Sequence, residues 1–140
     1  MKRGATQEIL LLSYPSGTNV TAGGENIGKT PLTIELSTKI GHELRFNMPG
    51  YQENIIDVLP HSDNASERNV TFGLAEQRGS YNTLSPNPVI AVLNEQSGKK
   101  TDPYEAMVSL VEMNDQWHKA GKISDQEHKR ITDAILSHFN

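Results

Sequence analysis

Short apolar segments, each bounded by turn-forming residues, occupy the first half of this chain. In Leu32–Leu36 and Val70–Leu74 every second residue is apolar, so an extended backbone would place these side chains on one face. Because no helical periodicity separates the segments, the pattern predicts an antiparallel β-sandwich over residues 8–74 and not a parallel α/β sheet. Strands are predicted near Ile9–Tyr14, Asn19–Ala22, Leu32–Leu36, Glu43–Asn47, Asn54–Leu59 and Asn69–Leu74.

The stretch that follows, residues 75–101, shows no clear periodicity. Pro86, Pro88 and Gly98 interrupt a polar composition there, so we interpret this stretch as a connector. One apolar run within it, Val89–Leu93, could be a strand that returns to the sandwich, and the sequence leaves this alternative open.

The last part of the chain, residues 102–140, has the apolar spacing of helices. Asp102 is a suitable N-cap with Pro103 at the first helical position, and a second helix is predicted to begin at Ser124, with Glu127 completing a capping box. The fold class is therefore mainly β with C-terminal α: a small antiparallel β-sandwich followed by a two-helix hairpin.

The first predicted helix carries apolar side chains around more than one side of its cylinder. Residues at this spacing form a packing face more often than a ligand groove. One short partner helix cannot cover them all, so the cover must come from the sandwich, from Val89–Leu93 or from another copy of the chain. We expect the hairpin to be separable from the sandwich and to drive self-association or docking of a protein partner. The candidate interface residues are Tyr104, Met107, Leu110, Met113 and Trp117.

Composition argues against several classes of function. The aliphatic run Ile9–Leu12 falls far short of the about 20 apolar residues of a membrane span and the about 7 to 15 of a signal peptide, so neither is expected. The chain has no cysteine for a disulfide or thiolate site. Its five histidines lack the spacing of helical metal-ligand pairs, so neither a metal nor a cofactor is predicted. The 13 basic residues are dispersed, which argues against a nucleic-acid partner.

One segment does match a catalytic signature. Residues Gly23–Thr30 fit the pattern G-x-x-x-x-G-K-[ST] of phosphate-binding loops. In such a loop Lys29 would reach the terminal phosphates and Thr30 would hold magnesium, at the start of a helix whose dipole faces the anion. However, Pro31 follows directly, and the alternation of Leu32–Leu36 predicts a strand where the helix is needed. Nucleotide hydrolysis is therefore kept as an outside alternative.

Turn residues recur between the predicted strands in a definite order. A Ser-x-Pro-x-Gly segment ends the first strand, a Gly-x-Thr-Pro-Leu segment opens a later one, and a Pro-Gly-Tyr turn follows. This series resembles the PEGA domain family over roughly residues 8–74, and the resemblance implies that the phosphate-loop string is a turn that enters a strand. The matching residues are Ser13, Pro15, Gly17, Gly24, Gly28, Thr30, Pro31, Leu32, Pro49, Gly50 and Tyr51.

The resemblance implies a small β-sandwich module without enzymatic activity, of a kind common in bacterial surface, periplasmic and lipoprotein contexts. The C-terminal part is similar to the short helical hairpins of the SHOCT family, which implies a role in assembly. The residues that carry this second similarity are Leu110, Gly121, Ile123, Ser124, Glu127 and Leu136.

Together these expectations describe a non-enzymatic bacterial cell-envelope module. Its sandwich serves as a binding domain or as a spacer, and its hairpin mediates assembly. Its location is expected to be the periplasm or cell envelope if an export signal was removed, and the cytoplasm otherwise. The alternative is a carbohydrate- or peptidoglycan-binding domain whose partner is a cell-wall glycan. For that alternative, the aromatic candidates near loops are Tyr14, Tyr51 and Tyr81.

Overall fold

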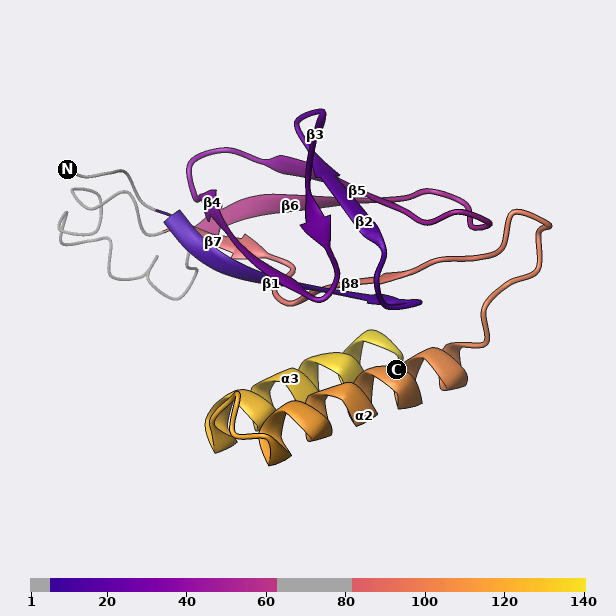
Figure 1. The fold of residues 1–140 in the computed structure, drawn as a ribbon. Helices are drawn as coiled ribbons and strands as arrows, with labels where there is room; N and C mark the ends of the chain where they lie inside the picture. Colours follow the sequence, from indigo (N-terminus) through magenta and orange to yellow (C-terminus); the bar gives the residue numbers. More distant parts are fainter. Residues whose placement is uncertain (1–5, 63–81) are drawn as a thin grey trace, which may run out of the picture.

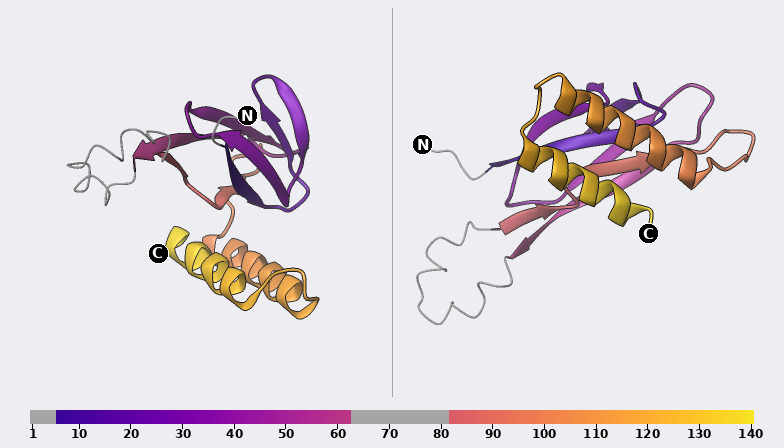
Figure 2. Two further views of the ribbon diagram at one scale, coloured as in Figure 1. Left: turned by 90° about the vertical axis from the view of Figure 1, so that its left-hand side faces the viewer. Right: turned by 90° about the horizontal axis from the view of Figure 1, so that it is seen from below.

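Two β-sheets and a helical hairpin lie in three layers (Figures 1 and 2). The structure is a computed structural model that describes residues 6–62 and 82–140. In this part of the chain one sheet has three strands in the order β4-β1-β8, and the other has five in the order β3-β2-β5-β6-β7. The elements are β1 (Thr6–Tyr14), β2 (Asn19–Ala22), β3 (Glu25–Lys29), β4 (Leu32–Ser37), β5 (His42–Asn47), β6 (Asn54–Ser62), β7 (Asn82–Ser85), β8 (Val89–Val92), α2 (Pro103–Lys119) and α3 (Asp125–His138).

Strands β1 and β8 of the middle layer are buried on both faces. In β1, Ile9 and Leu11 belong to the core between the two sheets, whereas Leu12 belongs to the core under the helices. In the neighbouring β8, Val89 faces the first core and Ile90 the second. Strands that are covered on both sides are nearly continuous apolar runs, which is why the two longest such runs of the chain form this layer.

Two hydrophobic cores hold the three layers together. The core between the sheets consists of Ile9, Leu11, Val20, Leu44, Phe46, Val58, Leu84, Val89, Ala91 and Leu93. The core between the three-stranded sheet and the hairpin consists of Leu12, Ile90, Leu110, Ile131 and Ile135. The hairpin therefore covers the outer face of β1 and β8, as the view from below in Figure 2 shows.

The predicted fold class is confirmed: the structure is mainly antiparallel β with two C-terminal helices, and the sheets do not close into a barrel. One pair differs from the expectation, because β8 runs parallel to β1, with Leu11 opposite Val89. Parallel neighbours require a long connection, and here the chain from β2 to β7 supplies it.

Several strands depart from the sequence-based expectation. β3 was not expected, and residues 75–101, interpreted as a connector, contain β7 and β8. The run left open as a returning strand is β8, which begins at Val89. The strand predicted at Asn69–Leu74 lies outside the described residues.

The helical hairpin has the predicted caps. The Asp102 side chain accepts a hydrogen bond from the backbone N–H of Tyr104 at 3.0 Å, and Ser124 and Glu127 form a reciprocal capping box. Gly121, at φ +73°, follows the end of α2 and lets the chain reverse. Within the described residues, no helix is long and apolar enough to cross a membrane.

Candidate functional site

The first group of predicted motif residues forms a buried hydrogen-bond network between two turns. The hydroxyls of Ser13 and Thr30 lie 2.6 Å apart, and the backbone N–H of Thr18 donates to the Thr30 hydroxyl at 3.1 Å. The Ser13 and Thr18 hydroxyls each donate to the carbonyl of Pro15 at 2.7 Å. All three hydroxyl-bearing residues are buried, so this network is part of the fold.

The single proton of each hydroxyl group determines which group donates in each of these hydrogen bonds. A serine hydroxyl has one proton, and that of Ser13 goes to Pro15. The Thr30 hydroxyl must therefore donate to Ser13 while it accepts from Thr18. Since every available donor in the set is used internally, the Thr30 hydroxyl has no proton left for a ligand.

The segment Gly23–Thr30 is a β-hairpin and does not have the geometry of a phosphate-binding loop. Gly23 and Gly24 both have positive φ angles, +59° and +83°, and join β2 to β3 as a two-residue turn. The exposed Lys29 ends β3, and β4 follows where a phosphate loop would continue as a helix. The sequence resemblance to such loops is thus a coincidence of the turn residues.

Gly28 and Gly50 have the backbone conformations that only glycine adopts easily. Gly28 lies within β3 at φ +138°, and an added β-carbon there would approach the Leu32 side chain to 3.1 Å. Gly50 has φ +90° and follows Pro49 in a turn closed by the Tyr51 N–H and the Met48 carbonyl at 3.0 Å. Pro followed by a positive-φ Gly is the arrangement of a type II turn. Gly17, at φ +83°, and Pro31 also border turns, so the motif residues act structurally.

The candidate interface on the first helix is largely covered within the chain. Leu110 is 2% exposed at the centre of the core under the hairpin, and Met107, Met113 and Trp117 pack against that core. Only Tyr104 of this set is freely exposed, at 68%. Of the covers that the sequence left open, β1 and β8 therefore supply the one for this face, and a role of these residues in association stays a prediction.

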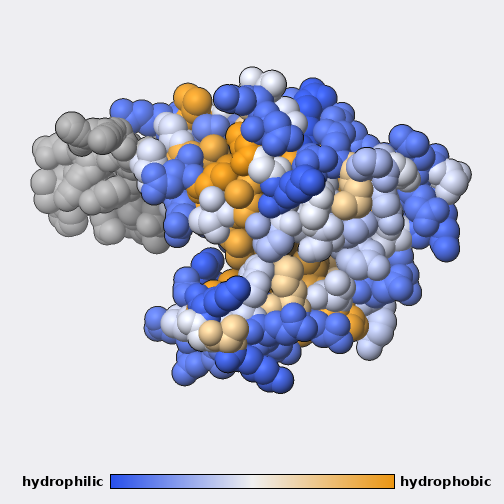
Figure 3. Space-filling model, viewed as in Figure 1, coloured by the Kyte–Doolittle hydropathy of each residue, from blue (hydrophilic) through white to orange (hydrophobic). Residues whose placement is uncertain are grey.

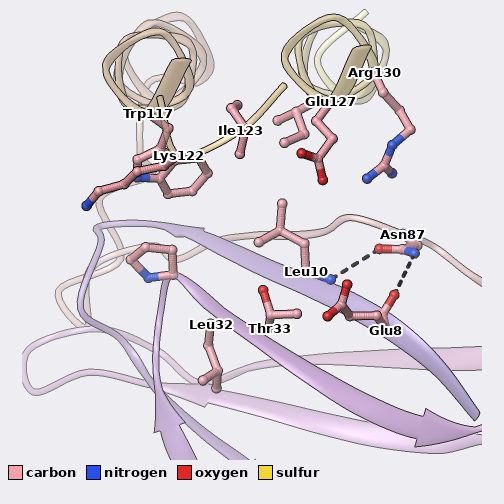
Figure 4. Close-up of a pocket in the computed structure, with 12 residues that line it drawn as sticks. Glu8, Leu10, Leu32, Thr33, Asn87, Trp117, Lys122, Ile123, Glu127 and Arg130 are labelled. Atoms are coloured by element: carbon pink, nitrogen blue, oxygen red, sulfur yellow. Dashed lines mark hydrogen bonds between the residues drawn. The ribbon is translucent and has the colours of Figure 1, made fainter. Parts of the chain in front are cut away.

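A cleft opens where the hairpin turn overhangs β1 and β4 (Figure 4). Its volume is about 270 Å³, close to the lower end of the roughly 300 to 1,000 Å³ of ligand pockets. Figure 3 shows the surface hollowed between the sandwich and the hairpin. The apolar lining comes from both layers: Trp117, Ile123 and Ile131 on the helical side, and Leu10, Pro31 and Leu32 on the sheet side.

Charged side chains surround this cleft. Glu127 is fixed at its wall, because its carboxylate accepts from the backbone N–H of Ser124 at 3.1 Å. Glu8 and Arg130 also line the cleft, and in the described part of the chain neither forms an ion pair. Figure 4 shows the Arg130 guanidinium on the side of Asn87, above the sheet. Lys122 lies beside Trp117, so charged side chains border the apolar lining at both ends of the cleft.

Of the residues that line this cleft, the sequence indicated only Trp117 as a candidate contact residue, whereas Pro31, Leu32, Ile123 and Glu127 were assigned to structural motifs. The others belong to β1, β4, the turn before β8 and the start of α3, which are far apart in the chain. No local spacing links them, so only the packing of the hairpin on the sheet could have revealed the site.

Two of the three loop tyrosines that the sequence offered for a sugar site, Tyr14 and Tyr51, lie in the described part of the chain. Tyr51 packs against the core between the sheets, and its backbone forms an isolated antiparallel β-bridge with Glu95. Burial, and to a smaller extent the nearby Glu105 carboxylate, raises the pKa of Tyr14 above 10.0. Tyr81 lies outside the described residues.

Two histidines join the helices of the hairpin. The rings of His118 and His128 stack with their centroids 4.3 Å apart. His118 contacts Asp125 at 2.6 Å and His128 contacts Asp115 at 2.7 Å, so each helix supplies one histidine and one carboxylate. Among the described residues, no group of three or more such side chains has the arrangement of a metal site.

Comparison with known proteins identifies the sandwich. The family model of the PEGA domain matches residues 6–75, which include the described strands β1 to β6 and the turn residues discussed above. No curated protein and no solved structure gives a significant match.

Proposed function

Because the chain belongs to the PEGA domain family, we propose that it is a non-enzymatic binding module of the bacterial cell envelope. Its ligand occupies the cleft between the sandwich and the hairpin. The observation that carries this proposal is the composition of the cleft, where the Trp117 ring and aliphatic side chains adjoin Arg130 and Glu8, which have no ion-pair partner among the described residues. Apolar pockets with a few convergent polar groups are typical of ligand sites.

We also propose a location for the module and a role for its hairpin in assembly. We place the module in the periplasm or envelope if an export signal was removed, and in the cytoplasm otherwise. The similarity of the hairpin to the SHOCT family supports a role in assembly with a protein partner. The solvent-facing side of the hairpin remains available for that role, since Tyr104 is 68% and Leu136 is 45% exposed.

A carbohydrate- or peptidoglycan-binding function is the second candidate. Trp117 supports it, because sugar sites stack an aromatic ring on the sugar and surround it with hydrogen-bonding side chains. Arg130, Glu8 and Thr33 line the same cleft and could supply those bonds. A cell-wall glycan with an attached peptide would use both the apolar and the charged parts of the cleft.

Trp117 is the only tryptophan, so its fluorescence reports on the cleft directly. The experiment titrates the full chain with disaccharide-peptide fragments of peptidoglycan, and separately with the same peptides lacking the sugar. Saturable emission changes are expected, and Arg130→Gln should weaken binding about tenfold, equal to roughly 1.4 kcal/mol. Lys119→Gln is the matched control on the exposed end of α2.

The two probes separate the candidates. A response that requires the sugar selects the carbohydrate function, and a response to both probes supports the more general binding module. If the folded protein responds to neither, or if Arg130→Gln binds as tightly as the natural chain, the cleft is not the binding site.

A further inference from the structure

Strand β4 lies at the edge of the three-stranded sheet. It pairs with β1 on one side, and no strand of the described residues pairs with its other side. Exposed edges of this kind are templates for pairing with another chain, and natural proteins commonly blunt them with charges, prolines or covering loops. The backbone orientation of the neighbouring strand β1 determines which N–H and C=O groups β4 presents at this edge.

The side chain of Asn87 reveals the orientation of the β1 backbone. It accepts a hydrogen bond from the Leu10 N–H at 3.2 Å and donates to the Glu8 carbonyl at 3.1 Å, and Asn87 precedes β8 on the side of β1 away from β4. The register pairs Leu10 with Thr33 and Glu8 with Glu35. Because the backbone N–H of Leu10 and the carbonyl of Glu8 point away from β4, both residue pairs are of the non-hydrogen-bonded kind.

In a non-hydrogen-bonded pair the backbone N–H and C=O groups of both residues point away from the partner strand. Thr33 and Glu35 therefore direct their N–H and C=O groups to the free edge of β4. Pro31, two residues earlier, has no N–H to offer, and the Ser37 carbonyl is already bonded to the His42 ring at 2.8 Å. The Thr6–Ser37 pair is of the same kind, so the Ser37 N–H also points outward. The available edge thus consists of the N–H and C=O groups of Thr33 and Glu35, together with the Ser37 N–H.

The apolar face of β4 is incompletely covered. Leu32, Ile34 and Leu36 face the core between the sheets but are only partly buried, as is Ile27 of β3. Figure 3 shows apolar side chains at the surface between β3 and β4. A strand added to the β4 edge would cover these side chains as well as pair the backbone groups.

We propose that two copies of this chain associate by antiparallel pairing of β4 with β4 about a two-fold axis at Ile34. In this register Thr33 lies opposite Glu35 of the partner subunit, and the N–H and C=O groups of Thr33 and Glu35 in the two copies form four hydrogen bonds. Ile34 meets Ile34 of the partner subunit, and Leu32 meets Leu36 of the partner subunit, on the apolar face. The edge is therefore complementary to itself.

The neighbouring registers are less favourable. A two-fold axis at Glu35 places its carboxylate opposite Glu35 of the partner subunit, and like charges directly opposite destabilise a strand pair. An axis at Thr33 places Glu35 opposite Pro31 of the partner subunit, which has no N–H to donate. Backbone pairing, charge and apolar contact thus all select the Ile34-centred register. The pairing of β4 does not depend on the ligand proposed for the cleft.

Cysteine cross-linking tests the register, since the chain has no cysteine of its own. Directly opposed residues lie about 4.5 to 5.5 Å apart between Cα atoms, within the range of about 4.4 to 6.8 Å that disulfides span. Ile34→Cys should therefore form a disulfide dimer under mild oxidation. Thr33→Cys and Glu35→Cys should each remain uncross-linked alone, but should cross-link when the two proteins are mixed before oxidation.

Sedimentation of the full chain provides the second measurement. The natural chain should sediment as a dimer, and Thr33→Pro should be a folded monomer, because the outward N–H that proline removes is not used within the described chain. Lys29→Cys, exposed on β3, is the control for random cross-linking. A monomeric natural chain, a dimeric Thr33→Pro, or Ile34→Cys cross-linking no faster than Lys29→Cys would overturn the proposal.

Discussion

The hydroxyl groups of Ser13 and Thr30 lie 2.6 Å apart, although 17 positions separate the two residues in the chain. Their contact ties the turn after β1 to the turn before β4. Two backbone bonds of 2.9 Å reinforce it, from the Gly17 N–H to the Thr30 carbonyl and from the Thr30 N–H to the Thr18 carbonyl. The residues that carry the family resemblance are thus the ones that hold these turns together.

Removing the Thr30 hydroxyl should destabilise the protein without changing its shape. Thr30→Val keeps the volume of the side chain but leaves the buried Thr18 N–H without its acceptor and Ser13 without a donor. Unpaired buried groups of this kind cost about 1 to 3 kcal/mol each. Urea unfolding should show this loss, whereas Thr83→Val, at an exposed position, should change stability by less than about 0.5 kcal/mol. Equal effects of the two variants would contradict the structural role of Thr30.

The chain should not bind nucleotides through Gly23–Thr30. The segment is a hairpin, the Thr30 hydroxyl is engaged internally, and no helix starts at Pro31. Calorimetry with ATP and magnesium should therefore give no binding heat, and Lys29→Ala should behave like the natural chain. Micromolar binding that is lost in Lys29→Ala would refute this reading.

The sequence predicted the turns and the sandwich because their signals are local. Pro49 followed by Gly50 specifies its turn through two residues, and Ile9–Leu12 and Val89–Leu93 are recognisable as apolar runs. What these runs did not reveal is that they are neighbours covered on both faces. That fact depends on the parallel pairing of β1 with β8, which no local pattern encodes.

β3 was missed for a different physical reason. Ile27 is its only large apolar residue, and the pairing with β2 shifts register between Val20 and Thr21, so no regular alternation exists to detect. The bulge and the positive φ of Gly28 interrupt the period that identifies strands. The cleft was missed because its walls belong to separate segments that only the docked hairpin brings together.

The contact between the two helices should depend on pH through Asp125. Its hydrogen bond to His118, and the charge of that ring, hold the pKa of Asp125 below its ordinary value of 3.8. The unfolded chain therefore takes up this proton at higher pH than the folded chain does. The stabilisation by Asp125 is present above about pH 4 and is lost as the pH falls through the lowered folded pKa.

Asp125→Asn tests this dependence. The natural chain should have the higher thermal midpoint at pH 6, and the gap between the two midpoints should close on acidification towards pH 2. Asp133→Asn, which removes a charge from the same helix, controls for the change in net charge. A gap that stays constant over this range would show that the His118 contact does not shift the protonation of Asp125.

The hairpin should prove inseparable from the sandwich, contrary to the expectation from sequence. A chain ending at Ser97 lacks both helices and exposes Leu12 and Ile90, which they bury in the full chain. Apolar patches of this kind promote aggregation, so the truncated chain should be less stable and should self-associate non-specifically.

A point variant makes the same comparison in the full chain. Leu110→Ala leaves a cavity in the core under the hairpin and should cost about 2 to 5 kcal/mol, whereas Tyr104→Ala, at a largely exposed position, should cost little. Urea unfolding measures both. The helices would be a separate unit if the chain ending at Ser97 stayed folded without aggregating and Leu110→Ala left the unfolding of the sandwich unchanged. Because Leu12 and Leu110 share one core, we expect a single cooperative transition that shifts with Leu110→Ala.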